Sequence, residues 1–160
     1  MHLGYPEQGH VSTYYPDSPD ITQEEIEYTA DFLKKQQLMP ENTRMRKTSS
    51  GYEVLIASAV TQPAIRDTKD VSWSLDGPYE GKTLRLVYGD HQAEMAKIAA
   101  NLAEAQKVSL NEAEASMQAE YVKSFHDGSM LAHMDSQRHW IQDKGPMVSD
   151  HSSKALPDTR

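Results

Sequence analysis

The chain contains no cysteine among its 160 residues. Disulfide bonds and thiolate chemistry are therefore excluded. It also lacks any apolar run near the roughly 20 residues that a membrane-spanning helix requires. Its first six residues, Met-His-Leu-Gly-Tyr-Pro, contain neither the basic nor the apolar region of a secretory signal. We therefore expect a soluble, cytoplasmic protein with no membrane partner.

Basic side chains are scarce as well. The chain has 16 lysines and arginines against 24 aspartates and glutamates, for a net charge of −8. Nucleic-acid backbones require clustered Lys and Arg, so we expect no nucleic-acid partner. The one cluster of basic residues contains Arg44, Arg46 and Lys47, and a position on two facing hairpin strands explains it more simply than nucleic-acid binding does. With 38% hydrophobic residues and a mean hydropathy of −0.71, the chain fits one domain with a modest core.

The first predicted helix covers residues 22–38, and the signals at its start agree. Thr22 can cap it, and Glu25 stands three residues later, which completes a capping box. Pro40 is expected to end the element. The apolar residues that predict its inward face are Ile26, Ala30 and Leu33.

Residues 43–47 and 52–60 predict a β-hairpin in which Gly51 supplies the turn. Residues 61–81 predict a long connection without regular structure, which is unusual and often functional. A further strand is predicted at residues 83–88. Its alternating residues are Leu84, Leu86 and Tyr88.

Helical periodicity dominates the rest of the chain. Asp90 is the expected cap of the next helix, and Ser109 with Glu112 is the expected capping box of a third. Asp127 and Gly128 interrupt the third helix, after which a similar apolar stripe continues. The stripes consist of Met95, Ile98, Leu102 and Ala105, then Ala113, Met117, Tyr121 and Phe125, then Met130, Met134 and Ile141. A small mixed β-sheet or barrel portion followed by helices predicts the α+β class.

Candidate catalytic and metal-binding residues are weak on spacing alone. The histidines on helical stretches, His126, His133 and His139, are seven and six residues apart. Neither gap gives the i, i+4 pair that holds zinc, and no His-Glu-x-x-His is present, so a surface or supporting role is favoured for each. Core filling is favoured for Met95, Met117, Met130 and Met134. Capping and dipole effects explain Glu24, Glu25 and Glu27, with a catalytic carboxylate pair as the less favoured alternative.

Motifs near the C-terminus carry a resemblance to a known family. Ser124-Phe125, Gly128-Ser129 and Ala132-His133 resemble the Ser-Phe-x-x-Gly-Ser-x-x-Ala-His pattern of the dipeptidyl peptidase III family. Residues 140–146 resemble its Trp-Ile-Gln-Asp-Lys-Gly-Pro, in which we interpret Trp140 as a large anchor. Smaller matches agree in order: Leu3-Gly4-Tyr5-Pro6 with Gly9, Phe32-Leu33, Asn42-Thr43-Arg44, Tyr52-Glu53-Val54 and Gly89-Asp90.

The resemblance implies both a fold and an activity. Family members are zinc peptidases that remove dipeptides from peptide N-termini, with zinc held by two His and a Glu and another Glu as base. This chain resembles a segment of their lower lobe, a mixed α/β region. The substrate cleft separates that lobe from a helical upper lobe that carries zinc. The family's His-Glu-Leu-Leu-Gly-His motif lies beyond this region, so no metal ligand and no catalytic residue carries over to this chain.

The resemblance stops near the family's substrate-binding residues. After the segment matched by Gly145 and Pro146, family members continue to a Glu and a Tyr, which hold the N-terminus of the substrate and its reacting carbonyl. Here the corresponding positions are Ser149, Asp150 and His151. A carboxylate that would bind an ammonium group is replaced by a hydroxyl, and a phenol by an imidazole. No substrate-binding residue is therefore assigned securely.

The expected organisation is a partial lower-lobe region at residues 1–148 and a disordered, non-family tail at residues 149–160. Codons for Val148-Ser149 can match the start of an intron, so we interpret the tail as translated intron and Met1 as an internal start. The sequence predicts a truncated family member that binds no zinc and is inactive alone. The alternative is a non-catalytic fragment that binds peptides or associates with the missing lobe or a full-length homologue.

Overall fold

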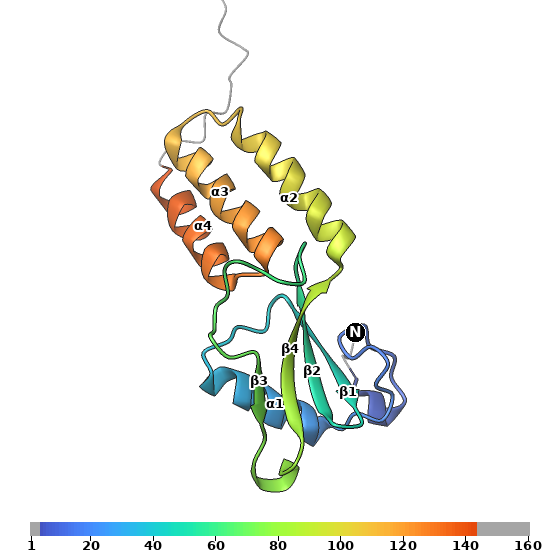
Figure 1. Cartoon of the computed structure of the whole chain (residues 1–160). Helices are drawn as coiled ribbons and strands as arrows, with labels where there is room; N and C mark the ends of the chain where they lie inside the picture. The colour runs from blue at the N-terminus through green and yellow to red at the C-terminus, as the bar shows by residue number, and fades with distance from the viewer. Residues whose placement is uncertain (1–3, 144–160) are drawn as a thin grey trace, which may run out of the picture.

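A computed structural model describes residues 4–143, which form a sheet half and a helical half (Figure 1). In chain order the elements are the short 3-10 helix η1 (Pro6–Gln8), α1 (Gln23–Lys35), β1 (Thr43–Thr48), β2 (Gly51–Ala57), β3 (Ser72–Ser74), the 3-10 helix η2 (Gly77–Tyr79), β4 (Thr83–Asp90), α2 (Gln92–Gln106), α3 (Glu112–Asp127) and α4 (Met130–Gln142). The sheet half contains α1 and β1 to β4, and the helical half contains α2, α3 and α4. A mixed sheet followed by helices confirms the predicted α+β class.

The sheet has the strand order β1-β2-β4-β3, in which β2 and β4 are parallel and the two outer pairs are antiparallel. The predicted hairpin is confirmed, but β2 ends at Ala57 instead of residue 60. Beyond it, the Ser58 N–H donates to the Asp90 carbonyl at 3.2 Å, and the Ala59 N–H donates to the Phe125 carbonyl at 3.1 Å. The first bond keeps Ser58 beside the end of β4, and the second joins the end of β2 to α3 in the helical half.

The connection at residues 61–81 is not irregular throughout, contrary to the prediction. It contains β3 and η2. On either side of β3, the Leu86 N–H donates to the Val71 carbonyl at 2.8 Å, and the Leu75 N–H donates to the Lys82 carbonyl at 2.9 Å. The prediction was wrong because the three residues of β3 are too few to show a strand's alternation, and their pairing comes from β4.

Helix α1 lies across one face of the sheet (Figure 1). Its rotation about its own axis differs from the predicted one. Leu33 is buried as predicted, but Ala30 is exposed and Ile26 is half-buried. Glu25 and Thr29 are buried instead, because Glu25 bonds to polar groups on the strands. The core between helix and sheet consists of Leu33, Tyr52, Val54, Ile56, Leu75, Leu84 and Leu86.

The ends of α1 test two sequence signals. The predicted capping box is confirmed, with the Glu25 N–H donating to Thr22 Oγ1 at 3.1 Å and the Thr22 N–H donating to Glu25 Oε2 at 3.0 Å. The helix ends at Lys35, three residues before the predicted residue 38. Gln37 has a φ of 59°, which a right-handed helix does not allow, and this explains the earlier end.

Asp90 does not cap α2, which corrects the prediction. The cap position is His91, which has a φ of 51° and gives no side-chain capping bond. The Asp90 carboxylate is held by Arg44 of β1, whose Nε and Nη2 donate at 2.7 and 2.6 Å. These bonds hold the pKa of Asp90 below its usual range, although burial opposes this. The Asp90 carboxylate therefore makes a two-bond ion pair with Arg44 of another strand instead of capping α2.

The start of α3 is also shifted from the predicted Ser109 and Glu112. Asn111 is the cap, and its side chain accepts from the Glu114 N–H at 2.8 Å. The Glu114 carboxylate in turn accepts from the Leu110 N–H at 2.7 Å. A reciprocal capping arrangement is thus present, but it begins two residues later than predicted. Asn is as good an N-cap as Ser.

The helical half has few buried residues, although α3 lies between α2 and α4 (Figure 1). Those that are buried are Ala99, Asp127, Met130, Ala132 and Ser136. Gly128, at φ 75°, caps the end of α3, which confirms the predicted interruption. Met130 of the predicted stripe on α4 is buried, but the rest of that stripe is not. Met134 and Ile141 are 39% and 71% exposed, and the predicted anchor Trp140 is 61% exposed.

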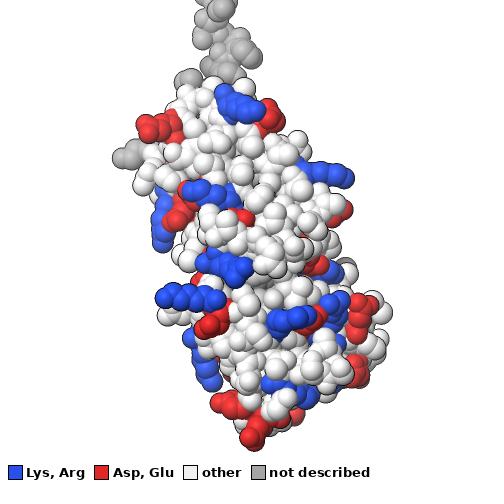
Figure 2. Space-filling model, in the orientation of Figure 1, with Lys and Arg blue, Asp and Glu red and all other residues white. Residues whose placement is uncertain are grey.

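Charged side chains are unevenly distributed over the visible surface. Figure 2 shows a broad uncharged area over the helical half, with lysines, arginines and acidic residues along its margins. Within residues 4–143, no helix is both long and apolar enough to cross a bilayer. The uncharged area lies on the helical half, in which three short helices pack in one layer.

Candidate functional site

The residues predicted to border a substrate site cannot be placed. Gly145 and Pro146 lie outside the described residues, and so do Ser149, Asp150 and His151. The predicted division between residues 1–148 and the tail falls outside them too. Within residues 4–143, the candidate sites are a polar cluster, an apolar groove and a joint that contains a family-like motif.

The three helical histidines do not converge. His126 lies in the last turn of α3, with its Nδ1 2.8 Å from Asp127 Oδ1. His133 lies on α4 with its ring centroid 5.8 Å from that of Tyr121, and His139 is half-buried two turns further along. Within residues 4–143, no three His, Asp or Glu side chains are grouped to hold a metal ion. These residues do not fit the zinc site that the family resemblance implies elsewhere.

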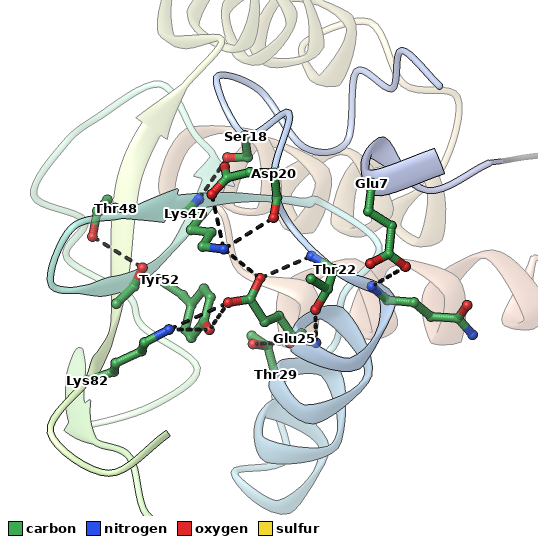
Figure 3. Close-up of polar contacts among 12 residues, drawn as sticks. Glu7, Ser18, Asp20, Thr22, Glu25, Thr29, Lys47, Thr48, Tyr52 and Lys82 are labelled. Atoms are coloured by element: carbon green, nitrogen blue, oxygen red, sulfur yellow. Dashed lines mark hydrogen bonds and ion pairs between the residues drawn. The ribbon is translucent and has the colours of Figure 1, made fainter. Parts of the chain in front are cut away.

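A polar cluster joins α1 to the sheet, with Glu25 at its centre (Figure 3). Glu25 Oε2 accepts from Lys47 Nζ of β1 at 3.0 Å, and Glu25 Oε1 accepts from the Tyr52 hydroxyl of β2 at 2.8 Å. Lys82, just before β4, donates to the Tyr52 hydroxyl at 3.2 Å and lies 3.5 Å from Glu25 Oε1. The Glu25 side chain is only 8% exposed, whereas those of Lys47 and Lys82 are 22% and 39% exposed, so the carboxylate is buried while the ammonium groups reach water.

The surroundings fix the protonation states of this cluster. Burial alone would raise the pKa of Glu25, but bonds from the Thr22 N–H, the Tyr52 hydroxyl and Lys47 lower it to about 2. Burial and the bond to Glu25 raise the pKa of the Tyr52 hydroxyl above its usual range. Glu25 therefore stays ionised and Tyr52 stays protonated near neutral pH. Neither group is suited to exchange protons with a substrate there.

The Glu25 cluster has a structural role, because its bonds hold α1 against the sheet. The carboxylate accepts bonds from α1's own cap, from β1 and from β2, and it interacts with a lysine that leads into β4. A buried charge with this many partners is satisfied, whereas removing one partner is costly. We interpret the Glu25 cluster as a brace that sets the position and rotation of α1. Capping and dipole effects were the favoured roles of Glu25 from the sequence, which gave no sign of its bonds to Lys47 and Tyr52 or its proximity to Lys82.

An apolar groove of about 750 Å³ opens beside α1, on the side where β1 forms the sheet edge. Its lining includes Ile26 and Ala30 of α1, Met45 and Val54 of the sheet, and Tyr15. Burial raises the pKa of Tyr15, so its phenol is protonated at neutral pH. The groove offers apolar contact surface of ligand-site size but no convergent catalytic group.

A joint connects the sheet half to the helical half at the turn between α3 and α4. Gly128 has a φ of 75°, and a Cβ there would lie 2.7 Å from Ile56 Cγ2 and 3.0 Å from the Ala57 carbonyl oxygen. Glycine is required because the turn lies directly against the end of β2. From the facing loop, the Asn42 amide donates to the Gly128 carbonyl at 3.0 Å. Ser129, which is 1% exposed, caps α4.

Two carboxylates tie the connection before β3 to this joint. Asp67 accepts from the Ser129 hydroxyl at 2.6 Å and from the Met130 N–H at 2.7 Å. Asp127 accepts from the Ile65 N–H at 3.2 Å. The sequence marked Gly128 and Ser129 through their family-like pattern. It gave no signal for Asp67, because the bonded residues are separated by 62 and 63 positions.

Comparisons with known proteins agree on one family. Residues 1–152 match the model of peptidase family M49. The chain is 41% identical over 139 residues to dipeptidyl peptidase 3 of Dictyostelium discoideum, covering 86% of this chain and 18% of that protein. It is 36% identical over 156 residues to the mouse protein of that name and 33% over 155 to the human one, each covering 94% of this chain and 21% of the relative. The chain thus spans about a fifth of these relatives.

Proposed function

Because this chain belongs to peptidase family M49, we propose that it forms a scaffold segment of a dipeptidyl peptidase and is inactive by itself. Full-length family members release dipeptides from the N-termini of oligopeptides by zinc-dependent hydrolysis, and this chain resembles part of their lower lobe. Its residues 4–143 supply a sheet, a joint and a helical layer, but no group of side chains that fits a metal ion.

The joint is the observation that carries this proposal. Its residues follow the family-like pattern around Gly128 and Ser129, and their structural roles account for them. Gly128 allows close contact with β2, and Ser129 caps α4 while donating to Asp67. Neither residue faces a metal-binding group within the described part of the chain. The pattern in this region therefore describes how two structural layers are held together.

Purified chain should be assayed with a dipeptidyl-arylamide substrate, with and without added zinc. We expect no release of the arylamine, because the hydrolysis needs a metal-activated water and the described residues offer no ligand set for the metal. Dipeptidyl peptidase 3 of Dictyostelium discoideum serves as the positive control. Zinc-dependent release by the chain alone, at a rate that scales with its concentration, would overturn the proposal.

The groove beside α1 favours a second candidate function, that of a peptide-binding fragment without catalysis. Its apolar lining, which includes Ile26 and Ala30, offers contact surface for hydrophobic side chains of an oligopeptide. Ala30 is exposed on the groove wall, so Ala30→Trp would fill the groove with little effect on folding. Calorimetric titration with oligopeptides should show binding that this variant loses. The control is Ala96→Trp, at an exposed position on α2, and equal binding by both variants would reject this function.

A further inference from the structure

Helix α4 carries exposed apolar side chains along one side. Leu131 is 51% exposed, Met134 is 39% exposed and Ile141 is 71% exposed. With the exposed Arg138, they stand at spacings of three, four and three residues, so all four lie along one side of the helix. We call these four residues the α4 seam.

The opposite side of α4 already provides the packing within this chain. Ala132 and Ser136 are buried there, and the neighbouring Gln137 side chain donates to the Tyr121 hydroxyl of α3 at 2.7 Å. Arg138 pairs only with Asp135 of its own helix among the described residues. The exposed parts of the apolar side chains in the α4 seam therefore remain available to a partner.

The spacing of the seam indicates what shape of partner it fits. Apolar residues at successive a and d positions of a heptad form the side of a helix that packs against another helix. The seam places Leu131 and Met134 in one such pair and Arg138 and Ile141 in the next. An extended peptide would instead need unpaired backbone groups, which the interior of α4 does not offer.

We propose that the α4 seam docks an amphipathic helix from the part of a dipeptidyl peptidase 3 polypeptide that lies outside these 160 residues. This rests on the proposed scaffold function. The family match includes α4, and about four-fifths of each relative's polypeptide lies outside the matched segment and can supply the helix. The occupying helix presents apolar residues to Leu131, Met134 and Ile141, and an acidic residue opposite Arg138.

Charge disfavours a second copy of this chain as the occupant. In a parallel pair of seams, Arg138 would face its own copy, and in an antiparallel pair it would face Met134. Neither arrangement gives the arginine an acidic partner from the other seam, and an unpaired charge at the centre of a helix interface is costly. A helix from a different segment can supply that carboxylate.

The absence of cysteine makes a direct test simple, because one introduced thiol is unique within this chain. Met134→Cys places it on the seam, and Val11→Cys places it at a residue that is 101% exposed in the sheet half. Each variant is co-expressed with Dictyostelium discoideum dipeptidyl peptidase 3 from which the segment similar to this chain has been deleted. Thiol labelling is then followed by mass spectrometry on the free chain and on the co-purified pair.

We expect Cys labelling at position 134 to slow by about tenfold in the pair, as at the core of an interface, while labelling at position 11 is unchanged. Leu131→Glu combined with Ile141→Glu should abolish co-purification but leave the circular dichroism of the free chain unchanged. Failure of the wild-type chain to co-purify, or equal labelling at position 134 in both states, would overturn the docking proposal. A pair that forms and protects the seam but releases no dipeptides would contradict the scaffold function alone.

Discussion

The sheet half and the helical half differ in where they bury apolar surface. The sheet half contains Leu84, which is fully buried, and Tyr52 and Val54, which are each 1% exposed. In the described part of the helical half, the buried hydrophobic residues are Ala99, Met130 and Ala132. Two of these three are alanines, which remove little apolar area from water. The core of this chain is therefore concentrated around α1 and the sheet.

The difference also extends to how polar groups are used. In the sheet half, long-range ion pairs such as Arg44 with Asp90 and Lys47 with Glu25 link separate elements. In the helical half, the ion pairs of Lys107 and of Lys123 join residues three positions apart on one helix or at its end. Exposed pairs of that kind contribute little to stability. The helical half therefore depends on neighbours, at the joint and on its open faces, more than the sheet half does.

Truncating one leucine in each half gives the largest expected contrast. Leu84→Ala should lower the free energy of unfolding by about 2–5 kcal/mol, because it leaves a cavity in a closed core. Leu102→Ala on α2 should cost about 1 kcal/mol, since that side chain is only half-buried. Urea denaturation of both variants measures this. Equal losses would show that the helical half has a core as closed as that of the sheet half.

In the sheet half, the sequence was sufficient to predict helices and strands whose signals lie within the element itself. The capping box of Thr22 and Glu25 and the alternation of Leu84 and Leu86 both lie within a few residues of sequence. The rotation of α1 was not predictable in this way. It depends on Glu25 reaching Tyr52, 27 positions further along the chain. A periodicity analysis therefore placed Ala30 in the core when it is exposed.

The second-largest expected difference in stability is between two glycine substitutions, one at the joint and one at an open turn. Gly128→Ala should cost about 1–2 kcal/mol for the left-handed backbone, and more because its Cβ meets Ile56 and the Ala57 carbonyl. Gly9→Ala is a matched control, with a φ of 80° and no atom within 4 Å of the added Cβ. Thermal unfolding should show the larger loss for Gly128→Ala. Losses of the same size would mean that the close contact with β2 contributes nothing.

The brace gives an effect that depends on pH. The folded-state pKa of Glu25 is lowered from 4.5 to about 2, so its stabilisation is full above the unfolded value and is lost as pH falls toward 2. Glu25→Gln should therefore cost about 2 kcal/mol at pH 7, because bonds to a charged group are lost. The cost should be smaller at pH 3. Denaturant titrations at both pH values test this, with the exposed Glu24→Gln as the control, and a pH-independent cost would contradict it.

The candidate site shows the same limit of sequence reasoning. The family-like pattern located Gly128 and Ser129, but not the partner that makes them a joint. Asp67 belongs to a stretch that predicted irregular structure, and its bonds to Ser129 and Met130 become visible only when that loop is placed against α4. Trp140 shows the opposite error, because its size predicted an anchor although it is 61% exposed among the residues described.

The smallest expected effect comes from the α4 seam of the chain in isolation. Ile141 is 71% exposed, so Ile141→Ser removes little surface that folding had buried. Its free energy of unfolding should change by less than about 0.5 kcal/mol, as for other surface substitutions. Met130→Ser, at a residue of the same helix that is 9% exposed, should cost several times more. Urea denaturation of the two variants decides the matter: a large loss for Ile141→Ser would mean that the seam is already covered by this chain itself, and that no partner helix is needed to bury it.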